Sequence, residues 1–143
     1  MTMAENLTFS EGIDLAAYQQ LRAMCGWTEL PEEEARAGLE GSAYTVSCLD
    51  GEKTVGCARI VWDGGYVAYL SDVIVETDYQ GQGIGRDLVE RSVAFVRSQL
   101  KPGWKIKIVL VAATGKEGFY ERLGFRWRPN EASGAGMDMW VQN

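Results

Sequence analysis

The spacing of apolar residues predicts helices near the start of the chain. Leu15, Tyr18, Leu21 and Cys25 recur at helical intervals after Asp14, which fits an N-cap. A second helix start is indicated where Pro31 precedes three glutamates, because proline and acidic residues both favour the first turn. The expected elements are a short strand at 7–10, a helix from 14 to about 26, and a helix from 31 to 38 or 41.

The middle of the chain changes to the alternation of apolar and polar residues that is typical of strands. The turn signals Asp50-Gly51 and Asp63-Gly64-Gly65 separate three such runs. This pattern predicts an antiparallel meander, because short turns join neighbouring antiparallel strands. The expected strands are 43–49, 54–62 and 66–75.

Helical spacing returns from Leu88 to Leu100 and stops at Pro102-Gly103. The run 104–112 then ends in continuous apolar residues, which is typical of a central strand that is buried on both faces. A short helix at 115–123 should end at Gly124. Terminal strands are expected at 125–128 and 137–142, on either side of a polar, glycine-containing loop. The whole chain, 1–143, is interpreted as one domain of mixed α/β type.

Composition excludes several functions. The 143 residues contain no histidine, so a Ser-His-Asp triad and a histidine metal site are ruled out, and no metal is expected. The net charge of −6 argues against nucleic-acid binding. No apolar run is long enough to span a membrane, and the start of the chain lacks the layout of a signal peptide, so a cytoplasmic protein is expected. The three cysteines are interpreted as small buried apolar residues.

The segment from Gln80 to Arg86 carries the strongest chemical signal. It follows a predicted strand, contains three glycines at alternate positions and opens directly into an amphipathic helix. Such a helix start offers free amides and a partial positive charge to phosphate groups. A Walker loop is excluded because Arg86-Asp87 follows the last glycine, and a G-x-G-x-x-G loop is excluded because its third glycine position is occupied by Arg86.

Gln80, Gly83 and Gly85 fill the fixed positions of the Q/R-x-x-G-x-G/A motif of the GNAT superfamily, which this chain resembles. Downstream, the segment 118–125 looks like the family's F-Y-x-x-x-G-F element. The resemblance implies a central mixed, mostly antiparallel sheet with splayed parallel fourth and fifth strands, flanked by about four helices. One position departs from the pattern, because Ala112-Ala113-Thr114 stands where many members have an asparagine that contacts the cofactor.

The resemblance implies an N-acetyltransferase that uses acetyl-CoA as cosubstrate and no metal. A hydroxyl at Tyr120 would protonate the leaving thiolate, or that side chain would only pack its helix. Dimers are common among such proteins, so a homodimer is an expectation by analogy. The implied cofactor-binding residues use mainly their backbone: Val73, Ile74, Val75, Gly81, Gln82, Gly83, Ile84, Gly85 and Arg86.

The acceptor amine must lose a proton before it attacks, and its ordinary pKa decides whether a base is needed. Asp72 is the first candidate base, directly or through water, because alternation places it on one face with Ile74 and Glu76 unless a bulge intervenes. Glu76 is the second candidate. Asp72 can equally be a hydrogen-bonded carboxylate at the end of its strand.

Trp27 can wall a substrate pocket between the first two helices or belong to the core. The acceptor is expected to be a small-molecule amine. The alternatives are a peptide or protein amine, or no acceptor at all in a non-catalytic module that binds acyl-CoA.

Overall fold

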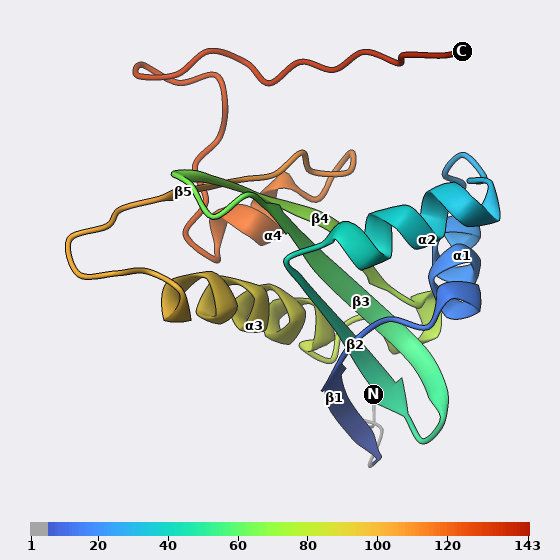
Figure 1. Ribbon diagram of the computed structural model, residues 1–143. Helices are drawn as coiled ribbons and strands as arrows, with labels where there is room; N and C mark the ends of the chain where they lie inside the picture. Colours follow the sequence, from blue (N-terminus) through green and yellow to red (C-terminus); the bar gives the residue numbers. More distant parts are fainter. Residues whose placement is uncertain (1–5) are drawn as a thin grey trace. The chain divides into compact units, whose positions relative to one another are not determined.

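The computed structural model describes residues 6–143, which divide into two compact parts, one ending at Leu110 and one spanning Val111–Asn143 (Figure 1). The first part holds the sheet and three α-helices, and the second holds one short helix. None of the helices in the described residues is both long enough and apolar enough to span a membrane.

The first part is built on a five-stranded sheet in the order β1-β2-β3-β4-β5. Neighbours from β1 to β4 pair antiparallel, and β4 pairs parallel with β5. The mixed, mostly antiparallel sheet with parallel fourth and fifth strands is therefore confirmed. Its strands are β1 (Leu7–Glu11), β2 (Tyr44–Asp50), β3 (Lys53–Trp62), β4 (Val67–Val75) and β5 (Lys107–Val109).

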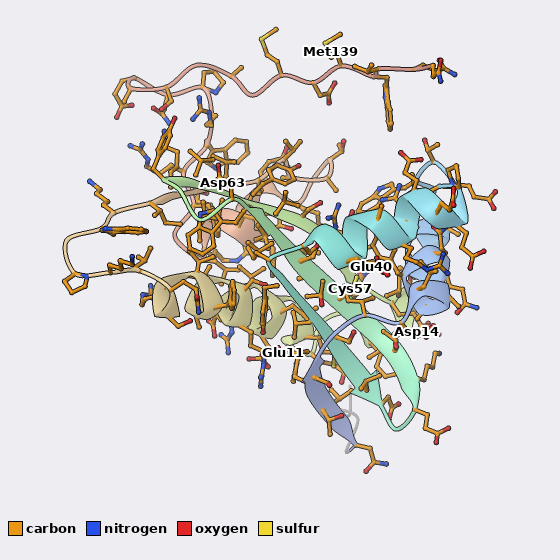
Figure 2. All side chains as sticks on the ribbon, viewed as in Figure 1. Glu11, Asp14, Glu40, Cys57, Asp63 and Met139 are labelled. Atoms are coloured by element: carbon orange, nitrogen blue, oxygen red, sulfur yellow. The ribbon has the colours of Figure 1, made fainter. Side chains whose placement is uncertain are left out.

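Helices cover both faces of this sheet (Figure 1). On one face, α1 (Leu15–Met24) and α2 (Glu32–Gly41) enclose a cluster of buried side chains that includes Cys57 of β3. Figure 2 labels Cys57 on that face. On the other face lies α3 (Ile84–Ser98), and a Cβ added at Gly56 would meet Ile84 and Leu88. Consecutive residues of β3 thus point to opposite helix layers, as the pleat of a strand requires.

Local sequence signals explain where the helices begin and how they pack. The Asp14 side chain accepts a 3.0 Å hydrogen bond from the Ala17 amide, so the predicted cap is confirmed. Phe95 of α3 stacks on Tyr44 at 4.7 Å between ring centroids and meets Trp62 edge-on at 6.5 Å. These aromatic contacts fix the long helix against β2 and β3.

The predicted strand at 104–112 is wrong in length and position. Only Lys107–Val109 pairs, and β5 lies at the end of the sheet rather than in its centre. A strand is extended only as far as a neighbour offers backbone partners. Within the described residues β5 has such a neighbour only at Val67–Tyr69 of β4.

The second part contains α4 (Glu117–Glu121), a shorter helix than the predicted 115–123. Gly124 has φ +101°, and the Phe125 amide donates to the Tyr120 carbonyl at 3.2 Å, as expected of a helix end. The predicted strands at 125–128 and 137–142 are wrong. In the part spanning Val111–Asn143 the structure shows a single isolated bridge, between Asn130 and Ser133, and assigns no strand.

Two of the cysteines fit the expectation of small buried residues. Cys48 and Cys57 are fully buried, and burial raises the pKa of the Cys48 thiol to about 11. Cys25, at the end of α1, is exposed, so the expectation was wrong for this residue.

Candidate active site

The two parallel strands of the sheet separate after a short contact. β5 pairs with β4 from Val67 to Tyr69, whereas β4 continues to Val75. From Leu70 onward, in the described chain, β4 is paired only with β3 on its other side. The strand therefore presents one open edge over its second half, where main-chain groups can bind an extended ligand as an added strand would.

A bulge interrupts β4 at the start of this open stretch. Ile74 pairs with Cys57 and Ser71 pairs with Arg59, so β4 holds one more residue than β3 between these pairs. Asp72 has φ +54°, the only non-glycine residue with positive φ in the described chain. Leu70 pairs with Ile60 on the α3 face, whereas Ile74 packs against α1 and α2. The bulge thus interrupts the alternation, although Asp72 and Ile74 do share the α1–α2 face.

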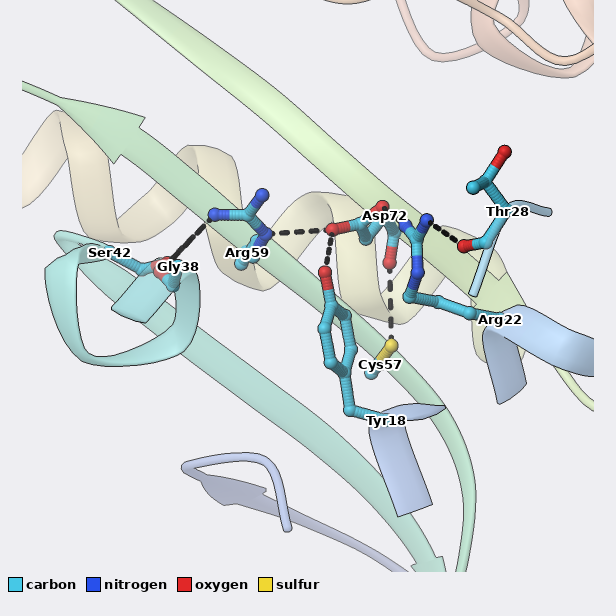
Figure 3. A network of polar contacts seen from close by, with 8 residues as sticks. All are labelled: Tyr18, Arg22, Thr28, Gly38, Ser42, Cys57, Arg59 and Asp72. Atoms are coloured by element: carbon cyan, nitrogen blue, oxygen red, sulfur yellow. Dashed lines mark hydrogen bonds and ion pairs between the residues drawn. The ribbon is translucent and has the colours of Figure 1, made fainter. Parts of the chain in front are cut away.

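The bulge points the Asp72 carboxylate into a cluster of donors (Figure 3). Tyr18 donates to Oδ2 at 2.6 Å and Arg59 donates to the same oxygen at 2.7 Å, while Arg22 lies 3.3 Å from Oδ1. The Asp72 side chain is 9% exposed, and those of Arg22 and Arg59 are 13% and 18% exposed. A nearly buried carboxylate is stable in such a place only when it is paired and hydrogen-bonded.

The same cluster ties α1, α2, β3 and β4 of the first part together. Arg59 also donates to the Gly38 carbonyl and the Ser42 hydroxyl at the end of α2. Arg22 also donates to the Thr28 carbonyl in the loop after α1. Burial and the bond to Asp72 raise the pKa of Tyr18 to about 12, so its phenol stays protonated and remains a donor at neutral pH.

The glycine-rich loop connects the open strand to α3. A 3₁₀ turn at Thr77–Tyr79 follows β4, and the Gln80 side chain donates to the Val75 carbonyl at 3.0 Å. Gly81 and Gly83 both have φ +84°, a conformation that favours glycine. A Cβ at either position would meet no atom within 4 Å, so the backbone angle is the reason for glycine there.

The first turn of α3 offers unpaired main-chain donors. Along the chain from Gly83, the first amide that donates to a main-chain carbonyl is that of Asp87, which bonds the Gly83 carbonyl at 3.1 Å. The amides of Gly83, Ile84, Gly85 and Arg86 have no acceptor among the described residues. The 15-residue helix adds the partial positive charge of its dipole at this end. The arrangement fits a diphosphate, whose oxygens accept several amide hydrogens at once.

A family model described as an acetyltransferase (GNAT) domain matches residues 41–127, which include the open strand, the loop and α3. The chain belongs to the GNAT acetyltransferase family. The match continues across the boundary between the two parts of the chain. The recognition of the family from its two motifs is thereby confirmed.

Two curated relatives are plant acetyltransferases. The chain is 33% identical to the chloroplastic serotonin N-acetyltransferase 2 of Oryza sativa subsp. japonica, over 87% of this chain and 62% of the relative. It is 32% identical to the histone acetyltransferase TAP1 of Glycine max, over 97% of this chain and 63% of the relative. The chain thus spans less than two thirds of the length of these two relatives.

A solved GNAT-like structure also resembles the chain closely. A probable acetyltransferase of unknown function from meticillin-resistant Staphylococcus aureus gives a TM-score of 0.82 at 25% identity, covering 96% of this chain and 99% of that one. The agreement over nearly the whole length confirms the GNAT fold and, with the relatives, an N-acetyltransferase enzyme.

The β2–β3 hairpin braces the loop of this GNAT domain. The Tyr79 hydroxyl donates to Asp50, and this bond raises the pKa of Tyr79 to about 12. Lys53 forms a 3.1 Å ion pair with Glu76 and lies 5.5 Å from the centre of the Tyr79 ring. Glu76, the second candidate base, is therefore paired with a lysine in this structure.

Trp27 lines a pocket of about 670 Å³ beside α1 and the loop that follows it. It also packs against the buried cluster under α1 and α2, and the Arg22 guanidinium lies 5.5 Å from the centre of its ring. Trp27 therefore has features of both interpretations from the sequence, since it lines a pocket and also packs against the core. Other residues that line the pocket are Leu15, Gln19, Arg22, Glu29 and Glu32.

Tyr120 lies in α4, in the second part of the GNAT chain. Its ring meets Phe119 at 4.9 Å and Phe125 at 6.0 Å, both edge-on, and it is half-buried. Phe125 belongs to the same sequence element that identified the family. The motif thus forms a local aromatic cluster around the tyrosine, which limits the positions its hydroxyl can take.

Sequence reasoning missed two members of the Asp72 cluster. Tyr18 was interpreted only as part of a helix stripe, and Arg59 was not singled out. An arginine within an otherwise apolar strand was the available signal, because a charged side chain there needs a partner. The identity of that partner depends on the bulge, which the sequence does not indicate.

Proposed function

We propose that this N-acetyltransferase moves an acetyl group from acetyl-CoA to the primary amine of a small molecule. The observation that carries the proposal is the set of unpaired amides from Gly83 to Arg86, which follows a strand with an open edge. A helix start of this kind binds phosphate groups, and CoA carries a diphosphate. The exposed Arg86 side chain adds a full positive charge at the first turn, where it also lies 3.8 Å from Glu90.

The residues present fit the cosubstrate in two stretches. The main chain of Val73, Ile74 and Val75 would pair with the pantetheine arm along the open edge of β4. The loop residues Gly81, Gln82, Gly83, Ile84, Gly85 and Arg86 would hold the diphosphate. When bound, acetyl-CoA supplies an activated acetyl group. The reaction forms the bond between the amine nitrogen and the acetyl carbon, and it releases the CoA thiol.

Two protons must move during this reaction. We assign Tyr120 to the thiol side, where its hydroxyl donates a proton to the departing sulfur. On the amine side, the contacts of Asp72 favour anchoring over proton transfer, because Tyr18, Arg22 and Arg59 occupy most of its acceptor sites. Water is then the simplest acceptor of the amine proton, and Asp72 as base remains the alternative that a pH profile can decide.

The pocket beside α1 supports a small acceptor. Glu29 and Glu32 line it together with Trp27, so a protonated amine is attracted electrostatically and an apolar body can lie on the indole. Arg22 connects this pocket to Asp72 of β4. The name of the rice relative, serotonin N-acetyltransferase, agrees with a small amine.

A peptide or protein amine is the second candidate, favoured by the soybean relative named as a histone acetyltransferase.

We also propose a cytoplasmic location. The alternative is the chloroplast, because the rice relative is named as chloroplastic, and cell fractionation distinguishes the two. We expect neither nucleic acid nor membrane among the partners.

The decisive experiment has two arms. The first follows thiol release from acetyl-CoA with a panel of arylalkylamines, polyamines, amino sugars and lysine peptides. Turnover with small amines supports the proposal, turnover with peptides alone supports the second candidate, and binding without any turnover indicates a sensor of acyl-CoA.

The second arm measures CoA binding by calorimetry in Gly85→Asp and Gly85→Asn. An aspartate in the first turn suits the helix dipole and so keeps the fold, but it repels a diphosphate. Asparagine has the same shape without the charge. Loss of binding in Gly85→Asp, with much weaker loss in Gly85→Asn, supports the site, and equal affinities contradict it.

A further inference from the structure

The pocket beside α1 combines an apolar wall with charged groups of both signs. It lies between α1 and the loop that leads to α2, and the Gln19 side chain fixes this loop by donating to the Leu30 carbonyl at 2.8 Å. The volume of about 670 Å³ is enough for a small organic molecule. The apolar wall consists of Leu15, Ala16, Ala23 and Trp27.

Arg22 connects this pocket to the strand on which the cosubstrate is proposed to lie. Its guanidinium donates to Asp72 of β4 at 3.3 Å and to the Thr28 carbonyl at 3.0 Å, and Figure 3 shows it between these two partners. Among the described residues, the pocket lining includes Arg22 of this ion pair and not Asp72. A guanidinium disfavours the charged form of an amine beside it, because like charges repel. The end of the pocket toward β4 therefore suits an amine in the neutral form that attack requires.

Two carboxylates line the pocket on the side of the loop. Glu29 directly follows Thr28, and Glu32 is the first residue of α2. Glu32 accepts a 3.0 Å hydrogen bond from Arg36 on the surface, where its own side chain is 72% exposed. Within residues 6–143 no lysine or arginine forms an ion pair with Glu29. The carboxylate of Glu29 is therefore available to a cation in the pocket.

These two ends make different demands on an acceptor. The nitrogen that attacks must be neutral and must reach β4, whereas the carboxylates of the loop favour a nitrogen that stays protonated. One amino group cannot meet both demands at once, but two amino groups joined by a hydrocarbon chain can, and the chain would lie on the apolar wall beside Trp27. The second ammonium also lowers the pKa of the first by repulsion, which reduces the cost of deprotonating the attacking nitrogen.

We propose that the acceptor is a linear diamine, anchored through one ammonium by Glu29 and Glu32 and acetylated on the other nitrogen, an assignment that rests on the proposed acetyl transfer to a small amine. The neutral nitrogen forms a bond to the acetyl carbon, and the carbon–sulfur bond breaks. The sulfur leaves as the CoA thiol with a proton that balances the one lost by the nitrogen. The product has a single amino group left, so it cannot occupy both ends as the diamine does, and the reaction slows sharply after one acetyl group.

The first test compares diaminopentane with pentylamine, which has the same chain and lacks the second amine. The ratio of their kcat/KM values for thiol release should favour the diamine by about tenfold in the wild-type chain, and added salt should reduce it because the carboxylates are exposed. Glu29→Gln combined with Glu32→Gln should remove most of this preference. Glu33→Gln combined with Glu34→Gln removes the same charge from the adjacent turn, outside the pocket lining, and should retain it. Circular dichroism checks that both variants keep the fold.

The second test does not require turnover. Calorimetric titration of diaminopentane into the protein with CoA present gives the affinity directly, and it should be about tenfold weaker in the Glu29 and Glu32 variant than in the Glu33 and Glu34 variant. Equal affinities in these two variants contradict the anchoring.

The outcomes separate this inference from the function on which it rests. Thiol release with pentylamine as efficient as with diaminopentane overturns the diamine and leaves a small-amine acetyltransferase in place. A second thiol released at the same rate as the first, with the diamine limiting, also overturns the anchored ammonium. Binding of CoA without thiol release from any amine overturns both proposals.

Discussion

The hydroxyl of Tyr18 lies 2.6 Å from Oδ2 of Asp72, a contact between residues 54 positions apart in sequence. It joins the first helix to the bulge in β4, beside the open edge where the cosubstrate is proposed to bind. Tyr18 is 2% exposed, so a lost partner cannot be replaced easily by solvent. The bond therefore helps to hold α1, which forms one wall of the pocket, against β4.

Replacing Tyr18 by phenylalanine should lower the free energy of unfolding by about 1–3 kcal/mol, the usual range for a buried hydrogen bond to a charged group. Urea unfolding followed by circular dichroism measures the difference. Tyr79→Phe is the matched control, because it removes a hydroxyl bonded to Asp50 at a different place in the fold. No change in stability for Tyr18→Phe would mean that the bond contributes nothing.

The same variant has a defined pH signature. The pKa of Tyr18 is raised to about 12 in the folded state, above the ordinary value of 10.0. The folded state therefore holds this proton more tightly, and the stability it contributes is complete below pH 10 and is lost as the pH rises through about 12. Unfolding measured at several pH values in this window should show a steeper loss for wild type than for Tyr18→Phe. Parallel slopes would contradict the assignment.

Asp72→Asn tests whether this carboxylate anchors α1 or accepts a proton. Asparagine keeps the size of the side chain and tolerates positive φ, so the change isolates the charge. We expect a loss of about 3–5 kcal/mol of stability, because Arg22 and Arg59 lose their shared partner. The pH dependence of kcat/KM should keep its shape. Disappearance of the acidic limb with little loss of stability would instead identify Asp72 as the base.

Gly83→Ala places a side chain on a backbone with φ +84°. We expect a cost of about 1–2 kcal/mol in stability and at least tenfold weaker CoA binding, because relief of the strain moves the amides of the first helical turn. Calorimetric titration and urea unfolding measure the two effects. Gly41→Ala is a suitable control, since a Cβ there also meets no atom within 4 Å and its φ is not positive. Unchanged CoA affinity would argue against the loop as the diphosphate site.

Tyr120→Phe should lower kcat by about 10²-fold while leaving CoA affinity within a factor of two, since general acid catalysis contributes about 10²–10⁴. Steady-state rates of thiol release and calorimetric CoA titration separate the two quantities. Phe119→Leu removes the neighbouring ring and controls for loss of packing in α4. Equal kcat in wild type and Tyr120→Phe would remove the proposed role.

Features set by local sequence were predictable. The cap at Asp14, the turn at Asp50-Gly51 and the helix that follows Gly83 depend on a few adjacent residues, and all were found where the sequence indicated. The glycine loop could likewise be located, because its conformation needs glycine and its proposed function needs a helix start.

Features set by distant partners were not predictable in the same way. The length of β5 and the state of residues 137–142 depend on which backbone lies beside them, and apolar alternation alone does not specify a partner. The donors around Asp72 come from α1 and β3 and meet only after the sheet has formed. Asp72 could therefore be named as chemically important, while its role depended on contacts that sequence spacing does not contain.

The bulge at Asp72 changes which face of the sheet the following side chains of β4 point to. Leu70, before the bulge, faces α3, and Ile74, after it, faces α1 and α2. If the same residues followed strict alternation without the bulge, every side chain after it would be reversed and Ile74 would point toward α3. Strict alternation would also interchange which main-chain groups of Val73 to Val75 point outward at the open edge. The irregularity at one residue thus sets both the side chains that each helix layer receives and the polarity of the edge on which the acyl carrier is proposed to lie.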